Sequence, residues 1–282
     1  MASHIGVFGS TGAGAGLTGP CTPEHTKGAL DGRQGRFRAR HLALALIAPC
    51  WQSPCMCGRF AAQLPPEFIS RLFRTNGDLP NIAASWNVAP TQPAMVVRLN
   101  RDTGERNLDV LQWGLVPYFT KDLKKAQRPI NARSETAAGS SVFREAMKKR
   151  RCLVPATAFY EWKAVADGKQ PYAFARTDGA PLALAGLWEA WRDAAGEVLR
   201  TFTILTTAAN ADMAPVHNRM PVILEEEEWR AWLGEVPRDL LTLLHPAADG
   251  VLRSWPVSRA VNNVRNDGAA LLEPAAADVS LL

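Results

Sequence analysis

Cysteine is scarce in this sequence, and its few copies follow no pattern that fixes a fold. The 282 residues contain five cysteines, Cys21, Cys50, Cys55, Cys57 and Cys152, with no CxxC pair and no paired cysteine and histidine spacing. A disulfide framework or a structural zinc site needs such spacing. We therefore expect neither, and we expect no metal and no cofactor. A reducing cytoplasm suits this cysteine usage.

Long apolar runs and a strongly basic body are also missing. No stretch approaches the roughly 20 apolar residues that span a bilayer, so we expect no membrane partner. The net charge is +5, but residues 1–55 carry +3 of it, which leaves little positive charge on residues 56–282. A nucleic-acid-binding surface of the strongly basic kind is therefore absent from the body. Any bound DNA would have to lie in a local groove.

Residues 1–55 differ in composition from the rest of the chain. They hold nine of the 21 glycines and show no apolar periodicity. Such a segment is typical of disorder. We expect a disordered extension, or upstream sequence translated from a start site assigned too early, with the working chain beginning at Met56. The short apolar run at 41–49 begins too late for a signal peptide. We expect residues 268–282 to form a loose tail.

Residues 56–282 alternate apolar runs with turn residues and contain more strands than helices. There is no strict strand–helix alternation, no internal repeat and no glycine-rich phosphate loop. This pattern predicts a single α+β domain with a curved, mainly antiparallel, barrel-like sheet and peripheral helices. The expected helices are 66–75, 140–150, 225–233 and 237–245, and the expected strands are 94–100, 108–116, 151–162, 172–177, 183–192 and 201–209.

Few residues in the body can carry histidine-dependent or buried carboxylate chemistry. Only His217 and His245 remain beyond residue 56. His245 ends a predicted helix, where a cation suits the helix dipole, so His217 is the better catalytic candidate, although a structural histidine fits too. Glu161 follows an apolar run, where a carboxylate is costly unless it is paired or used. An exposed glutamate at a strand end explains Glu161 equally well.

Other polar residues allow two interpretations each. Asn131 and Arg133 can grip a phosphate, or they belong to a solvated loop with an internal pair between Arg133 and Glu135. Asn87 precedes a proline turn, where asparagine commonly caps the backbone. Cys57 taken alone is more typical of a small buried side chain than of a nucleophile.

Eight short motifs follow one another from residue 56 to residue 267. They are MCGRF (56–60), WNVAPTQ (86–92), WGLVP (113–117), NARSET (131–136), RCLVPATAFYEW (151–162), TILTTAAN (203–210), VHNRMPVIL (216–224) and WPVSRAVNNVRND (255–267). In this order they closely resemble the SRAP family, the SOS response-associated peptidase proteins that process abasic sites in single-stranded DNA. The resemblance covers nearly all of residues 56–282 and nothing before Met56.

The resemblance implies that the initiator methionine is removed and that Cys57 becomes the N-terminal residue. A free α-amine, with a pKa of about 7.7–8.0, forms an imine with the aldehyde of a ring-opened abasic sugar. The thiol of the same residue then adds to the imine carbon and closes a five-membered thiazolidine ring. An internal Cys57 has only an amide nitrogen. Either translation starts at Met56, or the leader is cut off, and both routes expose the amine.

The family resemblance also implies roles for two further residues of the reaction centre. Glu161 orients or deprotonates the α-amine. His217 acts as general acid and base while the sugar opens and the Schiff base forms. The family's frequent PADGFYEW reads PATAFYEW here, with Thr157 and Ala158 in place of aspartate and glycine, which leaves Glu161 in register.

Contacts to DNA are expected from residues in several of the motifs. Asn131 and Arg133 hold the strand and the reacting sugar. The family often has a tryptophan shortly after WGLxP, and Phe119 is the nearest aromatic here, suited to stacking on a base. The remaining expected residues are Arg59, Thr206 and Arg219 as phosphate or backbone contacts, with Asn87 bracing the site.

The function implied by the resemblance is a covalent crosslink that shields abasic single-stranded DNA in the SOS and DNA-damage response. Three alternatives remain open. One is a thiol peptidase limited to self-cleavage before Cys57, with His217 as base. Another is a lyase that cuts the strand by β-elimination through the Schiff base, and the third is a module that binds damaged bases without bonding. We expect a cytoplasmic monomer, associated with the nucleoid when crosslinked.

Overall fold

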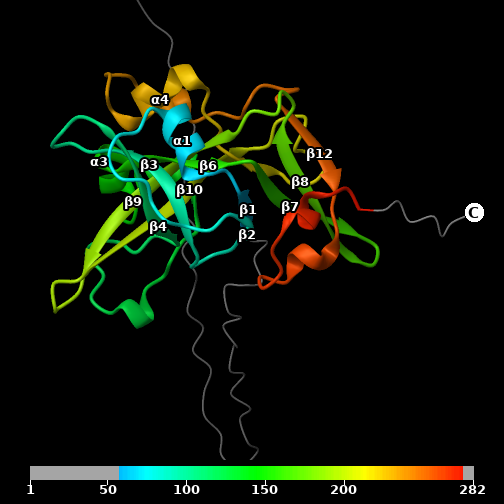
Figure 1. Ribbon diagram of the computed structural model, residues 1–282, viewed down its shortest axis with the longest axis horizontal. Helices are drawn as coiled ribbons and strands as arrows, with labels where there is room; N and C mark the ends of the chain where they lie inside the picture. Colours follow the sequence, from blue (N-terminus) through cyan, green and yellow to red (C-terminus); the bar gives the residue numbers. More distant parts are fainter. Residues whose placement is uncertain (1–56, 276–282) are drawn as a thin grey trace, which may run out of the picture. The chain divides into compact units, whose positions relative to one another are not determined.

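A closed barrel of five strands forms the centre of the fold in the computed structural model, which describes residues 57–275 (Figure 1). Antiparallel pairing joins the strands in the order β4, β3, β6, β9 and β10, and parallel pairing of β10 with β4 closes the ring. The bounds are β3 Pro93–Leu99, β4 Arg106–Trp113, β6 Arg151–Ala156, β9 Leu182–Arg192 and β10 Val198–Ala208.

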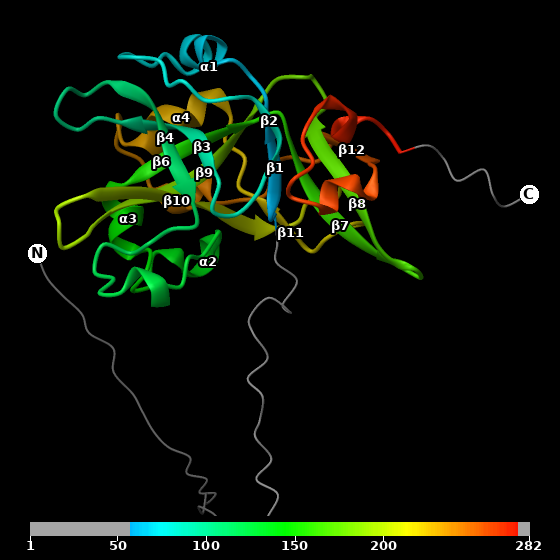
Figure 2. The same ribbon diagram turned by 60° about the horizontal axis from the view of Figure 1, so that its bottom comes forward.

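A second, open sheet lies beside the barrel. Its order is β12-β8-β7-β1-β2, and all of its pairs are antiparallel. Figure 2 shows β1 and β2 between the barrel strands and β7, β8 and β12. The bounds are β1 Arg59–Ala62, β2 Ser85–Val88, β7 Ala158–Val165, β8 Gly168–Arg176 and β12 Leu252–Pro256.

The chain crosses from the barrel to the open sheet at a single residue, Thr157, between β6 and β7. Its backbone N–H donates to the carbonyl of Ala61 at 2.9 Å, and its hydroxyl lies near Gln63 and Ala61. The predicted strand at 151–162 is therefore two strands in different sheets. The turn forms with threonine at 157, and Glu161 lies within β7.

Two short strands extend β10 at the end where the site lies. β5 (Asn131–Arg133) pairs with β10 in parallel, and β11 (Arg219–Pro221) pairs with it antiparallel. Consequently three motifs that are far apart in the sequence lie on adjacent strands.

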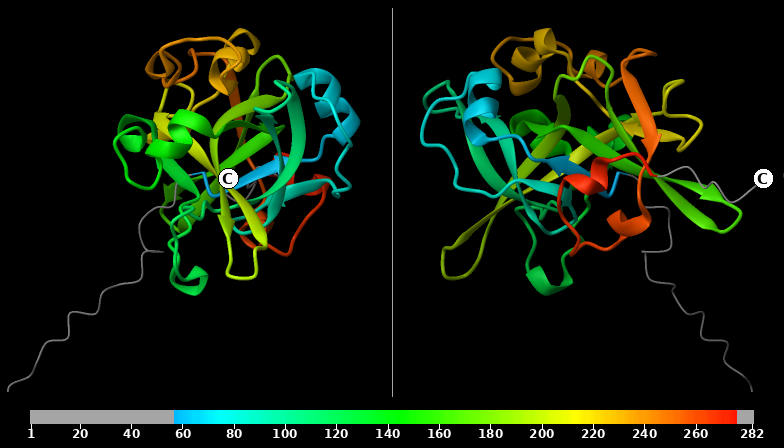
Figure 3. Two further views of the ribbon diagram at one scale, coloured as in Figure 1. Left: turned by 90° about the vertical axis from the view of Figure 1, so that its left-hand side faces the viewer. Right: turned by 45° about the vertical axis from the view of Figure 1, so that its right-hand side comes forward.

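Helices cover the outside of the barrel (Figure 3). Phe73 of α1 stacks on Trp229 of α4 with ring centroids 4.4 Å apart, so the two helices share one apolar cluster over the barrel. The α-helices are α1 Pro66–Phe73, α2 Ser134–Ala137, α3 Arg144–Lys149 and α4 Glu226–Leu233, and the short 3₁₀ helices are η2 Leu123–Lys125, η3 Leu240–Leu243, η4 Arg259–Asn262 and η5 Ala269–Leu272.

Trp113 joins the two sheets through the core. Its ring contacts Phe60 of β1 edge-on at 5.1 Å and lies parallel to Phe202 of β10 at 6.3 Å, measured between ring centroids. The indole nitrogen donates to the carbonyl of Ile130 at 2.8 Å, so a fully buried polar atom is satisfied. This contact fixes the segment that leads into Asn131.

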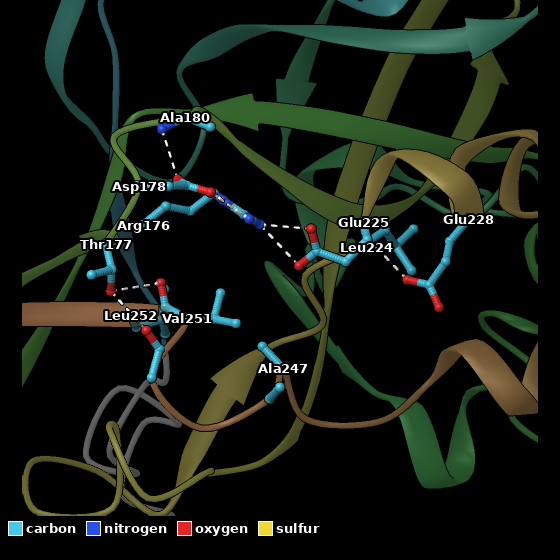
Figure 4. A network of polar contacts seen from close by, with 12 residues as sticks. Arg176, Thr177, Asp178, Ala180, Leu224, Glu225, Glu228, Ala247, Val251 and Leu252 are labelled. Atoms are coloured by element: carbon cyan, nitrogen blue, oxygen red, sulfur yellow. Dashed lines mark hydrogen bonds and ion pairs between the residues drawn. The ribbon is translucent and has the colours of Figure 1, made fainter.

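Arg176 connects the end of β8 to the beginning of α4 (Figure 4). Its guanidinium pairs with Asp178 at 2.8 Å and with both carboxylate oxygens of Glu225 at 2.9 Å. Glu225 also forms a capping box with Glu228, which satisfies free N–H groups at the start of the helix. The network fixes the helix relative to the open sheet.

The predicted helices at 66–75 and 225–233 are confirmed as α1 and α4, and the α+β class with a barrel-like sheet is confirmed. Two helices differ from the prediction. α3 begins only at Arg144, because Ser140 caps a preceding turn through the N–H of Val142 at 3.3 Å. The segment 237–245 contains only η3, since Asp239 caps a tight 3₁₀ turn instead of a regular helix.

Part of the predicted loose tail is ordered. Residues 268–275 include η5, Leu271 is 5% exposed, and the indole of Trp255 donates to the carbonyl of Leu272 at 2.8 Å. An apolar leucine and a carbonyl acceptor hold this segment to the open sheet. Residues 276–282, the extension 1–55 and Met56 lie outside the described residues. Within residues 57–275, no helix is long and apolar enough to cross a membrane.

Candidate active site

Cys57 and Glu161 meet at the beginning of β1. Strand β1 pairs with β7 so that Arg59 lies opposite Tyr160, and this register brings Cys57 to Glu161. The backbone nitrogen of Cys57 donates a hydrogen bond to Oε1 of Glu161. Cys57 is 2% exposed and Glu161 is 1% exposed. The sequence left an exposed glutamate open for this position, and the structure instead places the carboxylate in the interior.

The environment of Glu161 acts on its protonation in two directions. Burial raises the pKa of Glu161, because the charged form loses its hydration. Hydrogen bonds from Cys57 and the charge of His217 lower the pKa and oppose this effect. Burial is the larger influence. Glu161 is therefore a more basic carboxylate than an exposed glutamate, which suits a group that takes and returns a proton.

His217 lies in the loop that precedes β11 and is partly buried. Its Nδ1 accepts a hydrogen bond from the backbone N–H of Arg219 at 3.1 Å. Nδ1 also lies 3.3 Å from the backbone carbonyl of Arg219, so the backbone of Arg219 fixes the orientation of the ring, and the tautomer decides which of the two groups Nδ1 pairs with. The charge of His217 influences the pKa of Glu161, which indicates that the two side chains lie near each other.

Arg219 holds this loop against β10 and the NARSET segment. Its guanidinium binds both carboxylate oxygens of Glu135, with Nη2 to Oε2 at 2.9 Å, and Nη2 also donates to the carbonyl of Thr206 at 2.7 Å. The Arg219 hydrogen bond holds the pKa of Glu135 below its usual range. The alternative pair between Arg133 and Glu135 is wrong, because Arg219 occupies that carboxylate.

Asn131 and Arg133 lie on β5 beside β10. Asn131 is opposite Ile204 and Arg133 is opposite Thr206. Gly58 lies next to this segment, since a Cβ on Gly58 would be 4.0 Å from Cδ1 of Ile130. The side chain of Arg133 is exposed and makes no hydrogen bond or ion pair within residues 57–275. Its guanidinium is therefore available to a ligand.

Arg59 and Asn87 form a separate structural clamp. Oδ1 of Asn87 accepts from Arg59 at 2.8 Å, and its Nδ2 donates to the carbonyl of Asn266 at 2.9 Å, with longer contacts to two other carbonyls of the segment 261–266. Arg59 donates to carbonyls of the same segment, at 2.7 Å to Val261. Their polar groups are thus used within the protein, and a phosphate contact by Arg59 stays a prediction.

Phe119 lies in the loop after β4 and is 51% exposed. Its ring contacts Tyr118 edge-on at 5.3 Å between centroids. It lines a groove of about 580 Å³ whose walls include Val142, Phe143 and the cations Lys121 and Lys125, but not Cys57, Glu161 or His217. An exposed aromatic ring beside lysines suits a base and its phosphates.

Sequence reasoning missed the partners that hold the site together. Glu135 belongs to the NARSET motif, but nothing in the sequence indicated Arg219 as its partner. The hydroxyl of Tyr160 donates to the carbonyl of Trp86 at 2.8 Å, which ties β7 to β2 beside Glu161. The uninterrupted FYEW run was the only signal for it. Among residues 57–275, no group of histidine, cysteine and carboxylate side chains has a metal-binding arrangement.

Sequence comparisons identify the relatives of this chain. The family model for SOS response associated peptidase (SRAP) matches residues 56–264. The chain is 36% identical over 224 residues to the abasic site processing protein YoqW of Bacillus subtilis, covering 77% of this chain and 99% of that protein. It is 33% identical over 236 residues to the abasic site processing protein YedK of Escherichia coli, covering 78% of this chain and 100% of that protein.

A vertebrate relative and two solved structures extend the likeness. The abasic site processing protein HMCES of Xenopus tropicalis is 32% identical over 257 residues, covering 75% of this chain and 76% of that protein. A protein of Bordetella bronchiseptica has a TM-score of 0.63 and 31% identity, over 72% of this chain and 100% of that one. A protein of Bacteroides thetaiotaomicron, at 22% identity, shares the fold with a TM-score of 0.70, over 78% of this chain and 100% of that one. Because the family model covers residues 56–264 and the three abasic site processing proteins are 32–36% identical to this chain, the chain belongs to the SOS response associated peptidase family.

Proposed function

We propose that this protein processes abasic sites in DNA by bonding covalently to them through Cys57. Two lines of support converge. The relatives that match nearly their full length are abasic site processing proteins. The backbone nitrogen and the thiol of Cys57 lie together at the buried carboxylate of Glu161.

The reaction requires a free amine on Cys57, so the bond between Met56 and Cys57 has to be broken first. The amine then attacks C1′ of the ring-opened sugar, and loss of water gives an imine. The sulfur adds to the imine carbon while the thiol proton passes to nitrogen. The product is a thiazolidine ring that contains both heteroatoms of one residue, and the DNA strand remains intact.

Glu161 and His217 divide the proton transfers. Glu161 accepts a proton from the ammonium form of the amine, since its oxygen already lies at that nitrogen and burial raises its pKa. His217, fixed by the Arg219 N–H, donates its Nε2 proton to the departing ring oxygen of the sugar and then to the hydroxyl that leaves as water. The proton that the C1′ hydroxyl loses as the sugar opens restores the first proton that His217 gives, and the N–H proton that the carbinolamine loses as the neutral imine forms restores the second.

The proposed substrate is single-stranded DNA bound by a monomer. Arg133 offers an exposed, unpartnered guanidinium beside the reaction centre and suits the phosphate next to the abasic sugar. Phe119, with Lys121 and Lys125 in the same groove, suits an unpaired base and its phosphate. A duplex would keep its bases stacked away from such a ring.

The hydrogen bond between Cys57 and Glu161 is the observation that carries the proposal. Formation of a covalent adduct with abasic DNA tests the proposal. Protein that begins at Cys57 should give a heat-stable adduct with an abasic single-stranded oligonucleotide. Cys57→Ala should give none, and Cys57→Ser should stop at a Schiff base that borohydride traps. An equal yield from Cys57→Ala would disprove the mechanism. Cleaved strands would indicate a lyase, and reversible, salt-sensitive binding would indicate a non-covalent reader.

Self-cleavage before Cys57 is a second candidate activity, and the backbone of Cys57 favours it. Its φ is +40°, in the left-handed region that non-glycine residues rarely adopt. Breaking the preceding peptide bond would release this strain. The 282-residue chain should then convert to a form that begins at Cys57, as read by intact mass. Conversion that persists in a Cys57→Ala, Glu161→Gln double variant would assign the cut to another protease.

A further inference from the structure

A groove of about 570 Å³ lies beside the C-terminal ends of α3 and α4, next to η3. None of the residues assigned to abasic-site chemistry lines it. Its lining combines three cations with an aliphatic wall: Lys148, Arg151, Ala231, Gly234, Glu235, Val236, Pro237, Arg238 and Leu240.

Arg151 forms the floor of the groove. It is 9% exposed, and its Nε and Nη1 donate to backbone carbonyls, with Nη1 at 2.8 Å from both Met147 and Lys148. Its Nη2 makes no hydrogen bond within residues 57–275. A Cβ on Gly234 would lie 2.7 Å from Nη2, so only a glycine fits beside this edge of the guanidinium. Arg151 lines the groove, and Nη2 is its one guanidinium nitrogen without a hydrogen bond in the described part of the chain.

The groove lacks a free anion of its own. No carboxylate in the described part of the chain pairs with Arg151. Glu235 is bound by Arg106 at 2.5 Å and lies 3.4 Å from Arg230, so its charge is already compensated. Burial and the nearby charge of Arg101 lower the pKa of Arg151. A partly buried guanidinium without a counter-charge binds a carboxylate strongly, and here that carboxylate would have to come from another molecule.

The walls indicate which kind of anion fits. Val236, Pro237 and Leu240 are aliphatic, and Leu241 next to them is 62% exposed. No aromatic ring lines the groove, so it offers no face on which a nucleic-acid base stacks. Arg238 and Lys148 add positive charge, and Lys148 lies 3.6 Å from Glu145 on the same helix. Apolar side chains alternating with carboxylates complement this surface better than a phosphate backbone does.

We propose that this groove binds an acidic peptide segment of a partner protein, with one carboxylate on Nη2 of Arg151 and a neighbouring apolar side chain against Val236 and Leu240. Lys148 and Arg238 attract the flanking carboxylates. The site is independent of abasic-site chemistry and would bring the protein to a partner that carries an acidic, apolar segment.

Fluorescence anisotropy with capped, labelled peptides tests the proposal on the intact protein. A peptide of alternating glutamate and leucine should bind at least about tenfold more tightly than its glutamine–leucine or glutamate–serine counterparts, which lack either the charge or the apolar contact. Equal binding of all three peptides, or of none, would overturn the proposal.

Surface variants locate the binding without removing the buried arginine. Lys148→Glu with Arg238→Glu should lower the affinity for the glutamate–leucine peptide at least about tenfold, and Leu240→Ser should lower that affinity severalfold. Arg200→Glu with Lys169→Glu, an equal change of charge at two exposed positions elsewhere, is the matched control and should change nothing. Unchanged melting temperatures establish that each variant is folded. Equal loss in this control variant would reduce the effect to net charge and refute the site.

Nucleic acid is the competing occupant. An undamaged single-stranded oligonucleotide should fail to displace the peptide, and adduct formation with abasic DNA should keep its rate in the Lys148→Glu, Arg238→Glu variant. Displacement by the oligonucleotide, or a slower rate in that variant, would assign the groove to DNA and disprove the peptide site.

Discussion

The backbone nitrogen of Cys57 and Oε1 of Glu161 share a hydrogen bond across a separation of 104 residues in the sequence. The pairing of β1 with β7 creates this contact, and burial of the carboxylate makes it electrostatically significant. A nucleophile and a basic group are therefore fixed by backbone register.

Glu161→Gln should slow adduct formation about 100-fold, because the amide cannot take the amine proton. Glu227→Gln, an exposed substitution of the same kind, is the control. Single-turnover rates with protein that begins at Cys57 measure the effect. A Glu161→Gln variant as fast as the parent would assign the proton transfer to another group.

The raised pKa of Glu161 also makes stability depend on pH. The folded state holds this proton more tightly than the unfolded chain does. Its stabilising contribution is therefore complete below the ordinary glutamate pKa of about 4.3 and is lost as pH rises through the raised value. Relative to the parent, full-length Glu161→Gln should gain stability as pH increases, as measured by urea unfolding. A difference that stays constant from acid to neutral pH would contradict this expectation.

His217→Ala should reduce the rate of adduct formation about 100-fold, since the ring donates to the sugar oxygen. Free imidazole should restore part of the rate, because it replaces the proton donor without repairing any structure. His245→Ala is the control, because that histidine follows η3 and its ionic partner is Glu228 of α4, at 3.8 Å, and not a residue of the candidate site. A slower rate of adduct formation that imidazole does not restore, together with a lower melting temperature, would indicate a purely structural role for His217.

Arg219→Lys should slow the same reaction about tenfold by loosening the His217 loop, because lysine cannot bind both oxygens of Glu135. The loss of stability should stay below about 1 kcal/mol, since Glu135 is half exposed. Arg219 lowers the pKa of Glu135, so the pair stabilises above the ordinary glutamate pKa and loses its effect as pH falls. Arg200→Lys is the control. A stability difference that persists in acid would show that the charge pair is not responsible.

Asn87→Ala should destabilise the protein by about 1–2 kcal/mol, because it removes one acceptor of Arg59 and the amide that donates to the carbonyls of Asn263 and Asn266. Hydrogen exchange should quicken in that segment before it quickens in the barrel. Asn81→Ala, at an exposed asparagine, should have no effect on either measurement. Uniform exchange across the chain would mean that Asn87 does not act through the segment.

Gly186→Ala should destabilise the barrel by about 1–3 kcal/mol through overpacking. Gly186 of β9 lies between β6 and β10, and a Cβ there would be 2.8 Å from Sγ of Cys152 and 3.2 Å from the carbonyl of Thr203. Adding Cys152→Ala should recover part of the loss in a double-mutant cycle, because it removes the nearer contact. Strict additivity of the two changes would place the strain elsewhere.

Local patterns in the sequence were sufficient for α1, α4 and the β3–β4 hairpin, since each depends on neighbouring residues. They were insufficient where a distant partner decides the outcome. Thr157 separates two strands because each joins a different sheet, and η5 is ordered because Leu271 finds a buried position. Such outcomes depend on tertiary contacts that no local period contains.

The candidate site divides in the same way. Cys57, Glu161 and His217 followed from motif resemblance, and the structure brings them together, while their chemical roles stay proposals. The partners of Arg59, Asn87 and Glu135 could not be predicted, because a guanidinium, an amide and a carboxylate can each pair with many groups. Only the fold decides that Arg59 faces carbonyls and that Glu135 faces Arg219.

The long-range pairing around β10 also determines when the site exists during protein synthesis. Cys57 leaves the ribosome first, Glu161 follows, and His217 with β11 emerges only after β10 is complete. A nascent chain that stops before residue 219 contains the cysteine but not the surroundings that would direct its chemistry. Such a fragment lacks the β11 strand that follows His217, so the arrangement that the proposed reaction needs exists only once β11 has paired with β10.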